Sequence, residues 1–296
     1  MGARRREGKG LYKSEVVRII RRENPEGIFP PSFNSSLDYT AQGERTVVEK
    51  EVILEGRDIT KTYGGVHALD GISLSLHKNE VLALLGDNGA GKSTMIKILS
   101  GAIQPTSGEI FVEGKKVVFS STRDAKALGI ETAFQHLALV DCLSIEKNIY
   151  LGKEITKRIC GIEILQNKAM KQGALKFLSE VGFNIPDPNR PVEGLSGGQR
   201  HAVAISKCAF WTDKILILDE PTAALGVRET GKILNMIQEL KKKGLSIILI
   251  THNIEHAFLV ADRFFVLRAG QKVGEKAKEE TSADEIVKMI TGAIYV

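Results

Sequence analysis

Residues 81–93 read Val-Leu-Ala-Leu-Leu-Gly-Asp-Asn-Gly-Ala-Gly-Lys-Ser, an apolar run that ends directly in a glycine-rich loop. Five consecutive apolar residues are typical of a β-strand that is buried on both faces. The pattern from Ser93 to Ser100 predicts a helix. A strand before and a helix after G-x-x-x-x-G-K-S are the context that identifies a phosphate-binding loop. We therefore expect the phosphate chain of a nucleotide to bind here.

Each part of this loop has a physical task in holding ATP and Mg²⁺. Glycine lets the backbone approach closely enough for its amide groups to point at phosphate oxygens, and the helix N-terminus adds partial positive charge. We expect Lys92 to reach the β- and γ-phosphates, Ser93 to ligate Mg²⁺ and Thr94 to contact the α-phosphate. The predicted nucleotide-binding residues of the loop are Gly86, Asp87, Asn88, Gly89, Ala90, Gly91, Lys92, Ser93 and Thr94.

Outside the loop, strand patterns alternate with helix patterns. Strands are predicted at 52–54, 72–76, 109–114, 214–218, 246–250 and 264–267, and helices at 164–180, 200–211 and 227–243. This alternation predicts an α/β fold with a parallel core. A segment that favours helices, about 136–210, interrupts the core. We expect residues 51–296 to form one folded unit.

Two acidic residues follow the buried strand that is predicted at 214–218. Asp219 stands at the carboxyl end of that strand, where it can hold the Mg²⁺ shell. Glu220 comes next, and a carboxylate there can polarise a water for attack on a phosphoryl group. We expect Glu220 to be a catalytic residue.

A second glycine-rich motif, Leu195-Ser196-Gly197-Gly198-Gln199, precedes a predicted helix. The hydroxyl of Ser196 and the glycine amides at a helix start can hydrogen-bond a γ-phosphate. The motif therefore adds Ser196, Gly197, Gly198 and Gln199 to the predicted nucleotide contacts. It distinguishes the chain from kinases, GTPases and helicases that share the first loop.

With both motifs present, the chain resembles the ATP-binding cassette subunits of ABC transporters. The resemblance implies a P-loop NTPase fold with a mixed-sheet core, an antiparallel β subdomain and a helical subdomain insertion. It also implies that each ATP lies between the first motif of one cassette and the second motif of its partner. Residue by residue, it implies that Tyr63 stacks on adenine, that Gln135 senses Mg²⁺ and the γ-phosphate, and that His252 contacts the γ-phosphate.

One position departs from the family pattern. Most cassettes have an aspartate six residues after the catalytic glutamate, and this chain has Gly226. In the family that aspartate crosses the dimer interface and helps to couple the two sites. The wording Pro221-Thr222-Ala223-Ala224-Leu225-Gly226 resembles bacterial importers of ribose, xylose, galactose and fructose. That resemblance implies a homodimer on the cytoplasmic face of the cell membrane, bound to permease subunits and served by an extracytoplasmic sugar-binding protein.

Charge distribution argues against a nucleic-acid partner. The net charge is +5, but residues 1–22 hold eight Lys or Arg and two Glu, whereas residues 51–296 hold 31 basic and 29 acidic side chains. Binding of a phosphate backbone needs a concentrated basic surface, which a nearly neutral body does not offer. Two alternatives stay open, a soluble ABC-type ATPase acting on nucleic acid or ribosomes and a weakly hydrolytic regulatory cassette.

Three remaining features are the N-terminal extension, the length of the apolar runs and the cysteines. Residues 1–50 are expected to be a flexible extension with a short amphipathic stretch. No apolar run approaches the ~18–20 residues that a bilayer crossing requires, so membrane association is expected to come through partners. Cys142, Cys160 and Cys208 are far apart, without a Cys-x-x-Cys pair, and are expected to be free thiols.

Overall fold

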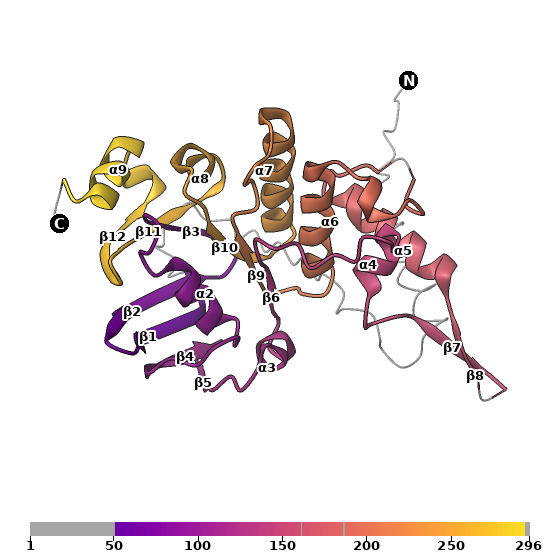
Figure 1. Cartoon of the computed structure of the whole chain (residues 1–296), viewed down its shortest axis with the longest axis horizontal. Helices are drawn as coiled ribbons and strands as arrows, with labels where there is room; N and C mark the ends of the chain where they lie inside the picture. The colour runs from indigo at the N-terminus through magenta and orange to yellow at the C-terminus, as the bar shows by residue number, and fades with distance from the viewer. Residues whose placement is uncertain (1–50, 161, 186, 294–296) are drawn as a thin grey trace, which may run out of the picture.

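The computed structural model describes residues 51–160, 162–185 and 187–293, and the expectations for residues 1–50 lie outside this part of the chain. Two sheets and a set of helices form a layered body, which is extended on one side by further helices and a small hairpin (Figure 1).

The central sheet has the strand order β12-β11-β3-β10-β9-β6. Its strands are β3 (Val81–Leu85), β6 (Ile130–Ala133), β9 (Ile215–Asp219), β10 (Ser246–Ile250), β11 (Arg263–Arg268) and β12 (Gln271–Ala277). Neighbours pair in parallel except β12, which is antiparallel to β11. Ile250 pairs with both Leu84 and Asp219, so three strands end at one level. The loops after them therefore meet at one edge of the sheet, where ligands bind in open α/β sheets.

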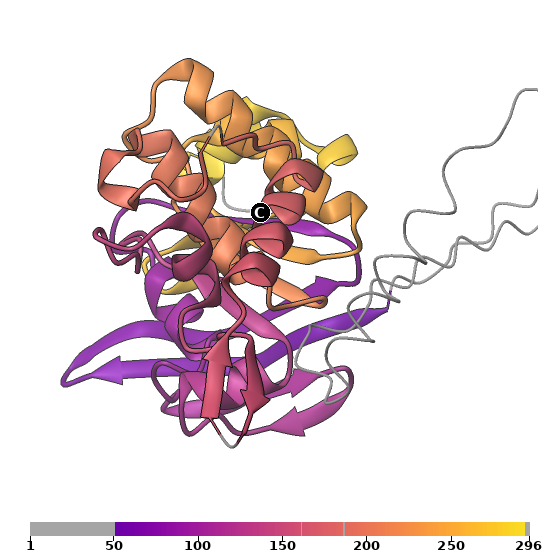
Figure 2. The same ribbon diagram turned by 90° about the vertical axis from the view of Figure 1, so that its right-hand side faces the viewer.

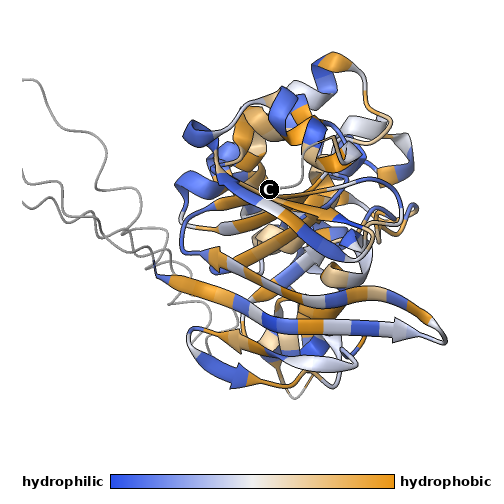
Figure 3. Ribbon diagram, turned by 90° about the vertical axis from the view of Figure 1, so that its left-hand side faces the viewer, coloured by the Kyte–Doolittle hydropathy of each residue, from blue (hydrophilic) through white to orange (hydrophobic). Residues whose placement is uncertain are grey.

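A second, antiparallel sheet covers one face of the central sheet. It has the order β2-β1-β4-β5 and consists of β1 (Val52–Tyr63), β2 (Val66–His77), β4 (Ser107–Val112) and β5 (Lys115–Val117). Helix α2 (Lys92–Leu99) lies between the two sheets, and its Met95 and Ile96 pack in one cluster with Leu54 of β1 and Leu84 of β3. Figure 3 shows apolar residues along the strands of both layers.

Helices cover the opposite face of the central sheet. They are α7 (Val227–Lys242), α8 (Ile254–Val260) and α9 (Ala283–Thr291), together with α6 (Gly197–Ala209) at one side. Strand β9 shows how the core is divided, because Ile215 and Ile217 belong to the cluster beside the antiparallel sheet while Leu216 and Leu218 belong to the helical cluster. This alternation is the period of two expected of a strand buried on both faces.

A helical group lies beyond β6 and α6. It contains α4 (Ile145–Tyr150) and α5 (Asn167–Glu180). The remaining short elements of the chain are helix α3 (Thr122–Ala127) and the 3-10 turns η1 (Val192–Gly194) and η2 (Lys278–Glu280). The ring of buried Tyr150 packs edge-on against Phe210 and Trp211, with centroids 5.1 and 5.5 Å away. These aromatic contacts join α4 to the end of α6.

The helix that we predicted from Ile164 is wrong at its start. Strands β7 (Thr156–Ile159) and β8 (Ile162–Leu165) form an antiparallel hairpin, and α5 begins only at Asn167. Ile159 pairs with Ile162, and Lys157 pairs with Ile164, so three isoleucines share one face of the hairpin. Pairing with β7 overrides the helical pattern of this stretch. The hairpin projects from the helical group in Figure 1, and it faces the viewer in Figure 2.

Two other expectations concern single residues and membrane spans. Cys142, Cys160 and Cys208 are free thiols, as predicted. Among the helices of the described residues, none has the length and apolar content that a membrane crossing needs.

Candidate nucleotide site

The phosphate loop is shaped by close backbone contacts that exclude side chains. Gly86 has φ 152°, and a Cβ there would lie 2.3 Å from the Leu267 carbonyl oxygen. Gly91 has φ 103°, and a Cβ there would lie 2.7 Å from the Ala68 carbonyl oxygen. Both distances are too short for any side chain, so the loop requires glycine at these positions. Gly91 also caps α2, which directs the first amides of that helix into the loop.

Lys92 fills the loop with its own ammonium group. Its Nζ donates to the carbonyl oxygens of Gly86 at 2.7 Å and Asp87 at 2.9 Å. The side chain is buried, and this burial lowers the pKa of Lys92 although nearby carboxylates act to raise it. A cation held in this loop at the start of α2 is suited to oxyanions of a phosphate chain.

Two carboxylates stand opposite the loop, at the end of β9. Burial, and then the charge of Glu220, raise the pKa of Asp219. Glu220 has a left-handed backbone with φ 51°, which is uncommon for a residue with a side chain and marks local strain. Its backbone amide donates to the Ile250 carbonyl oxygen at 2.9 Å, which ties this strained residue to the end of β10.

The side chain of Glu220 is held without a hydrogen bond. Its Oε2 is buried and lacks a hydrogen-bond partner, and His252 Nδ1 lies 3.0 Å away but outside hydrogen-bonding orientation. The His252 side chain is 70% exposed, whereas that of Glu220 is 14% exposed. An unsatisfied buried carboxylate beside a phosphate loop needs an explanation, and a water or a ligand that it contacts during function provides one.

These groups line one cavity of about 580 Å³. From the predicted residues it brings together Asp87 to Thr94, Gln135, Asp219, Glu220 and His252. Sequence reasoning did not find three further lining residues, Ala68, Ala223 and Ile250. They are small or apolar side chains without a motif of their own, so their place in the cavity depends on the fold.

The cavity suits a metal ion that is shared with phosphates rather than held by protein alone. Within the described residues, no group of three His, Cys, Asp or Glu side chains could hold a metal ion. Ser93, Gln135 and Asp219 nevertheless line the same cavity. Mg²⁺ usually takes one or two protein ligands together with phosphate oxygens and water. The donor set of this cavity therefore fits Mg²⁺ that arrives with a nucleotide.

Tyr63 does not line this cavity. It ends β1, its side chain is 49% exposed, and Lys61 Nζ lies 5.3 Å from the ring centroid. Its predicted stacking on adenine stays a prediction.

The second glycine motif lies elsewhere. Ser196 caps α6, where its Oγ accepts from the Gln199 amide at 3.3 Å and the Gln199 Oε1 accepts from the Ser196 amide at 2.9 Å. This reciprocal pairing leaves the hydroxyl proton of Ser196 available to a further acceptor. Ser196, Gly198 and Gln199 line a separate hollow of about 250 Å³ together with Phe183, Arg228, Glu229 and Lys232. Among the described residues, no side chain lines both this hollow and the nucleotide cavity.

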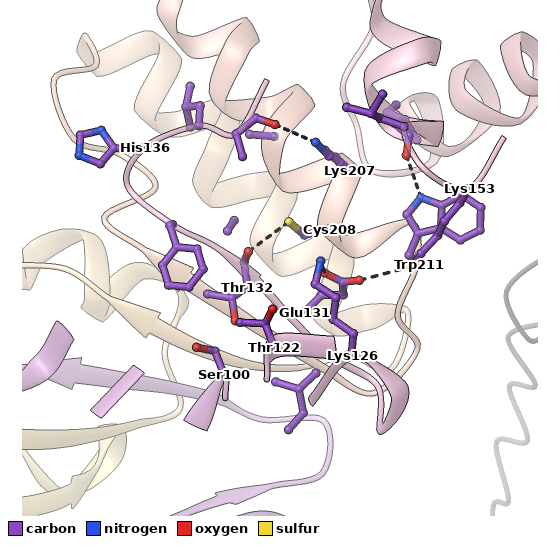
Figure 4. A pocket seen from close by; sticks show the side chains of 18 residues that line it. Ser100, Thr122, Lys126, Glu131, Thr132, His136, Lys153, Lys207, Cys208 and Trp211 are labelled. Carbon is purple, nitrogen blue, oxygen red and sulfur yellow. Dashed lines mark hydrogen bonds and ion pairs between the residues drawn. The ribbon is translucent and has the colours of Figure 1, made fainter. Parts of the chain in front are cut away.

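A third hollow of about 270 Å³ is lined by residues next to Gln135 in the sequence, among them His136 (Figure 4). Gln135 lines the nucleotide cavity, whereas its neighbours Phe134 and His136 line this hollow. We call it the Trp211 hollow, and its lining also includes Lys126, Glu131, Leu137, Leu151, Lys153, Cys208 and Trp211. One short segment thus separates the nucleotide cavity from a mainly apolar surface.

Charged groups mark the base of the Trp211 hollow. Buried Glu131 lies 3.1 Å from Lys126 Nζ and 3.6 Å from Lys153 Nζ, and Lys153 also lies 4.6 Å from the Trp211 ring centroid. Burial raises the pKa of Cys208 to about 12, so this group is a thiol rather than a thiolate near neutral pH. Lys153 follows α4 and Glu131 lies in β6, so this ion pair joins the helical group to the central sheet.

Comparison with known families decides among nucleotide-binding folds. The sequence profile of the family described as ABC transporter matches residues 69–223, which include the phosphate loop, Gln135, the second glycine motif and Glu220. The chain belongs to the ABC transporter family. It is an ATPase of the ABC cassette type. We call the second glycine motif, residues 195–199, the signature motif.

Several curated ABC relatives are similar over most of this chain. The xylose/arabinose import ATP-binding protein of Sulfolobus acidocaldarius is 49% identical over 81% of this chain and 94% of that protein. The fructose import ATP-binding protein of Rhizobium meliloti is 45% identical over 82% of this chain and 95% of that protein. The ribose import ATP-binding protein of Caldanaerobacter subterraneus is 40% identical over 82% of this chain and 48% of that protein.

Solved ABC cassettes share the fold. An ATP-binding cassette in its ADP conformation has a TM-score of 0.69 and 25% identity, over 81% of this chain and 95% of that chain. A dimeric cassette bound to ADP and phosphate after hydrolysis has a TM-score of 0.64 and 26% identity, over 76% of this chain and 99% of that chain. The predicted fold class is thereby confirmed, including the antiparallel β subdomain and the helical insertion.

Proposed function

We propose that this cassette hydrolyses ATP to drive uptake of a simple sugar through separate membrane subunits. The observation that carries the proposal is the separation of the two glycine motifs. The cavity beside Lys92 holds the phosphate loop and Glu220, while Ser196 and Gly198 line another hollow. One chain therefore offers two half-sites, and a head-to-tail pair of chains would complete two nucleotide sites. The names of the xylose/arabinose and fructose import relatives support the sugar class.

The roles of the residues follow from their places in the cavity. Lys92 and the amides of the loop hold the β- and γ-phosphates, and Asp219, Ser93 and Gln135 hold Mg²⁺, which neutralises phosphate charge when it is bound. Glu220 accepts a hydrogen bond from the attacking water, because its Oε2 makes no hydrogen bond and is paired only with His252 Nδ1, 3.0 Å away. His252, beside Glu220, contacts the γ-phosphate from the open side of the cavity.

The signature motif serves the ATP of the partner cassette. Gly197 and Gly198 are the first residues of α6, and Ser196 keeps a free hydroxyl proton. These groups are hydrogen-bond donors at the positive end of a helix, which suits a γ-phosphate. They hold no metal and no base, so they act by positioning and by completing the enclosure of the nucleotide.

The Trp211 hollow is the proposed contact with the membrane subunit. Its wall is the Gln135 segment, so a segment of the membrane subunit seated there would sense changes in the nucleotide cavity. Leu151 lines this hollow and is 42% exposed, and Phe134 is 37% exposed. This arrangement supports a position of the cassette on the cytoplasmic face of a cell membrane, with an extracytoplasmic sugar-binding protein as an indirect partner.

Replacing the catalytic carboxylate tests the hydrolytic half of the proposal. Glu220→Gln should lower ATP turnover by about 100-fold or more while ATP-dependent dimerisation, measured by size-exclusion chromatography, persists. Glu255→Gln, an exposed acidic residue of α8, is the matched control and should leave both unchanged. Full turnover in Glu220→Gln would remove Glu220 from the catalytic role.

A second experiment tests the contact with the membrane subunit. Leu151→Glu should abolish binding of the membrane subunits and leave the basal ATP turnover of the isolated cassette intact. Val118→Glu is the control, because Val118 is 74% exposed and does not line the Trp211 hollow. Equal binding by both variants would show that the membrane subunit docks elsewhere.

A further inference from the structure

Glu229 fills the space between the signature motif and the start of α7. A Cβ on Gly198 would lie 2.7 Å from Glu229 Cγ and 2.8 Å from Glu229 Cβ, so the stem of Glu229 packs directly on that glycine. The carboxylate turns the other way, because its Oε2 lies 3.0 Å from the place that a Cβ on Gly226 would take. One side chain therefore spans from the signature motif to the N-cap of α7.

The same turn of α7 is joined to the catalytic carboxylate. Residues 221–225 connect Glu220 to Gly226, and two of them make hydrogen-bond contacts with neighbouring residues. The Ala223 amide donates to the Glu220 carbonyl oxygen at 3.1 Å, and buried Thr222 places its Oγ1 3.2 Å from His256 Nδ1. A short loop with these two contacts therefore connects Glu220 to the first turn of α7.

We propose that Glu229 is a positioning residue that couples the two ATP sites of the paired cassettes. The inference rests on the proposed head-to-tail pairing, in which Glu220 acts on one ATP and the signature motif of the same chain holds the other. Glu229 links these two elements within one chain. Its Oε2 lies 3.0 Å from the place that a Cβ on Gly226 would take, so the carboxylate missing from position 226 is supplied from one turn further along.

The experiment separates two effects of a side chain at the start of α7, its carboxylate charge and its capping of the helix. In the full-length chain, Glu229→Ala should lower ATP turnover at saturating ATP about tenfold and bring the Hill coefficient for ATP close to 1. The double variant Gly226→Asp/Glu229→Ala should recover turnover to within about twofold of the original and restore the Hill coefficient. Gly226→Asn/Glu229→Ala should not, although Asn caps a helix as well as Asp does.

Controls distinguish this idea from a structural role and from the pairing on which it depends. Glu239→Ala, on the same helix and paired with Lys242 at 2.7 Å, should change neither turnover nor the Hill coefficient. Equal recovery by the Asn and Asp double variants would overturn the inference, because capping alone would then explain it. An unchanged Hill coefficient in Glu229→Ala would also overturn it. If the original chain turned over ATP at full rate when diluted until it is monomeric, the paired arrangement itself would fail.

Discussion

The phosphate loop and the signature motif both depend on glycine, but for different physical reasons. In the phosphate loop, Gly86 and Gly91 have positive φ angles and lie against carbonyl oxygens of the backbone. In the signature motif, Gly197 and Gly198 have ordinary φ angles, and their closest neighbours are the side chains of Leu225 and Glu229. The first loop is therefore fixed by the backbone of its own chain. The second is bordered by side chains, those of Leu225 and Glu229.

The two loops also differ in charge. The phosphate loop contains Lys92 and faces Asp219 and Glu220, and burial shifts the pKa of Lys92 downward and that of Asp219 upward. The residues Leu195-Ser196-Gly197-Gly198-Gln199 have no charged side chain. In the proposed paired site, the phosphate-loop side thus supplies the charged groups. The signature-motif side supplies uncharged groups that position the nucleotide. The predictions below test this division.

The largest expected effect comes from moving a side chain into the first loop. Gly91→Ala should weaken ATP binding by about 100-fold, because its Cβ would come within 2.7 Å of the Ala68 carbonyl oxygen and displace the loop. Gly197→Ala should leave ATP affinity of the isolated chain unchanged, since its Cβ would meet only the Leu225 side chain at 3.7 Å. Fluorescent-nucleotide titration measures both.

A second variant separates space from backbone strain in that loop. Gly89 has φ 78° but open space around a Cβ, so Gly89→Ala suffers strain alone and should weaken ATP binding less than Gly91→Ala does. If Gly197→Ala weakened ATP binding of the isolated chain as much as Gly91→Ala, the division between the two loops would be wrong.

Much of the fold could be predicted because its signals are local. The fully buried strands β3 and β10 have the bounds predicted from their apolar runs, Val81–Leu85 and Ser246–Ile250. Helix α7 likewise begins at the predicted Val227. A strand buried on both faces leaves a continuous apolar run in the sequence, and a motif at its end fixes where the loop lies.

What could not be predicted depends on contacts between distant segments. The hairpin β7–β8 owes its form to cross-strand pairing rather than to a strong local pattern. Glu131 and Lys153 meet through packing of the helical group on β6. Glu229 of α7 packs on Gly198 of α6, and strand β9 lies between these two helices in the sequence. In a single sequence these look like ordinary charged surface residues.

The next largest effect concerns the base end of the nucleotide. Tyr63→Ala should weaken ATP binding about tenfold if the ring stacks on adenine, because such stacking contributes roughly 1–3 kcal/mol per base. Tyr63→Phe keeps the ring and should bind as the original does. An unchanged affinity in Tyr63→Ala would show that the phosphate loop holds ATP without help from β1.

A smaller effect is expected at the signature motif, where stability and turnover can be separated. Ser196→Ala removes the N-cap of α6, so it should cost about 1 kcal/mol of unfolding free energy and lower ATP turnover as well. Ser196→Asn keeps a capping side chain but lacks the hydroxyl proton, so turnover should fall while Tm stays within about 1 °C. Full turnover in Ser196→Asn would mean that this hydroxyl is not a phosphate donor.

The smallest expected effect is a gain in stability from removing charge on the catalytic side. Because the pKa of Asp219 is raised in the folded chain, ionising this carboxyl costs stability as pH rises from its unfolded value of 3.8 through the higher folded value. Above that range the penalty is constant, so Asp219→Asn should raise the Tm of the nucleotide-free protein at pH 7, by about 2 °C since the carboxyl is half-buried. Below about pH 3.8 the carboxyl is protonated in both states and the difference should vanish.

Asp213→Asn, just before β9, is the control. With MgATP the original chain should have the higher Tm, because Asp219 then binds a cation. If Asp219→Asn were less stable than the original chain without nucleotide, the view that Asp219 is a destabilising charge kept for the metal would be wrong.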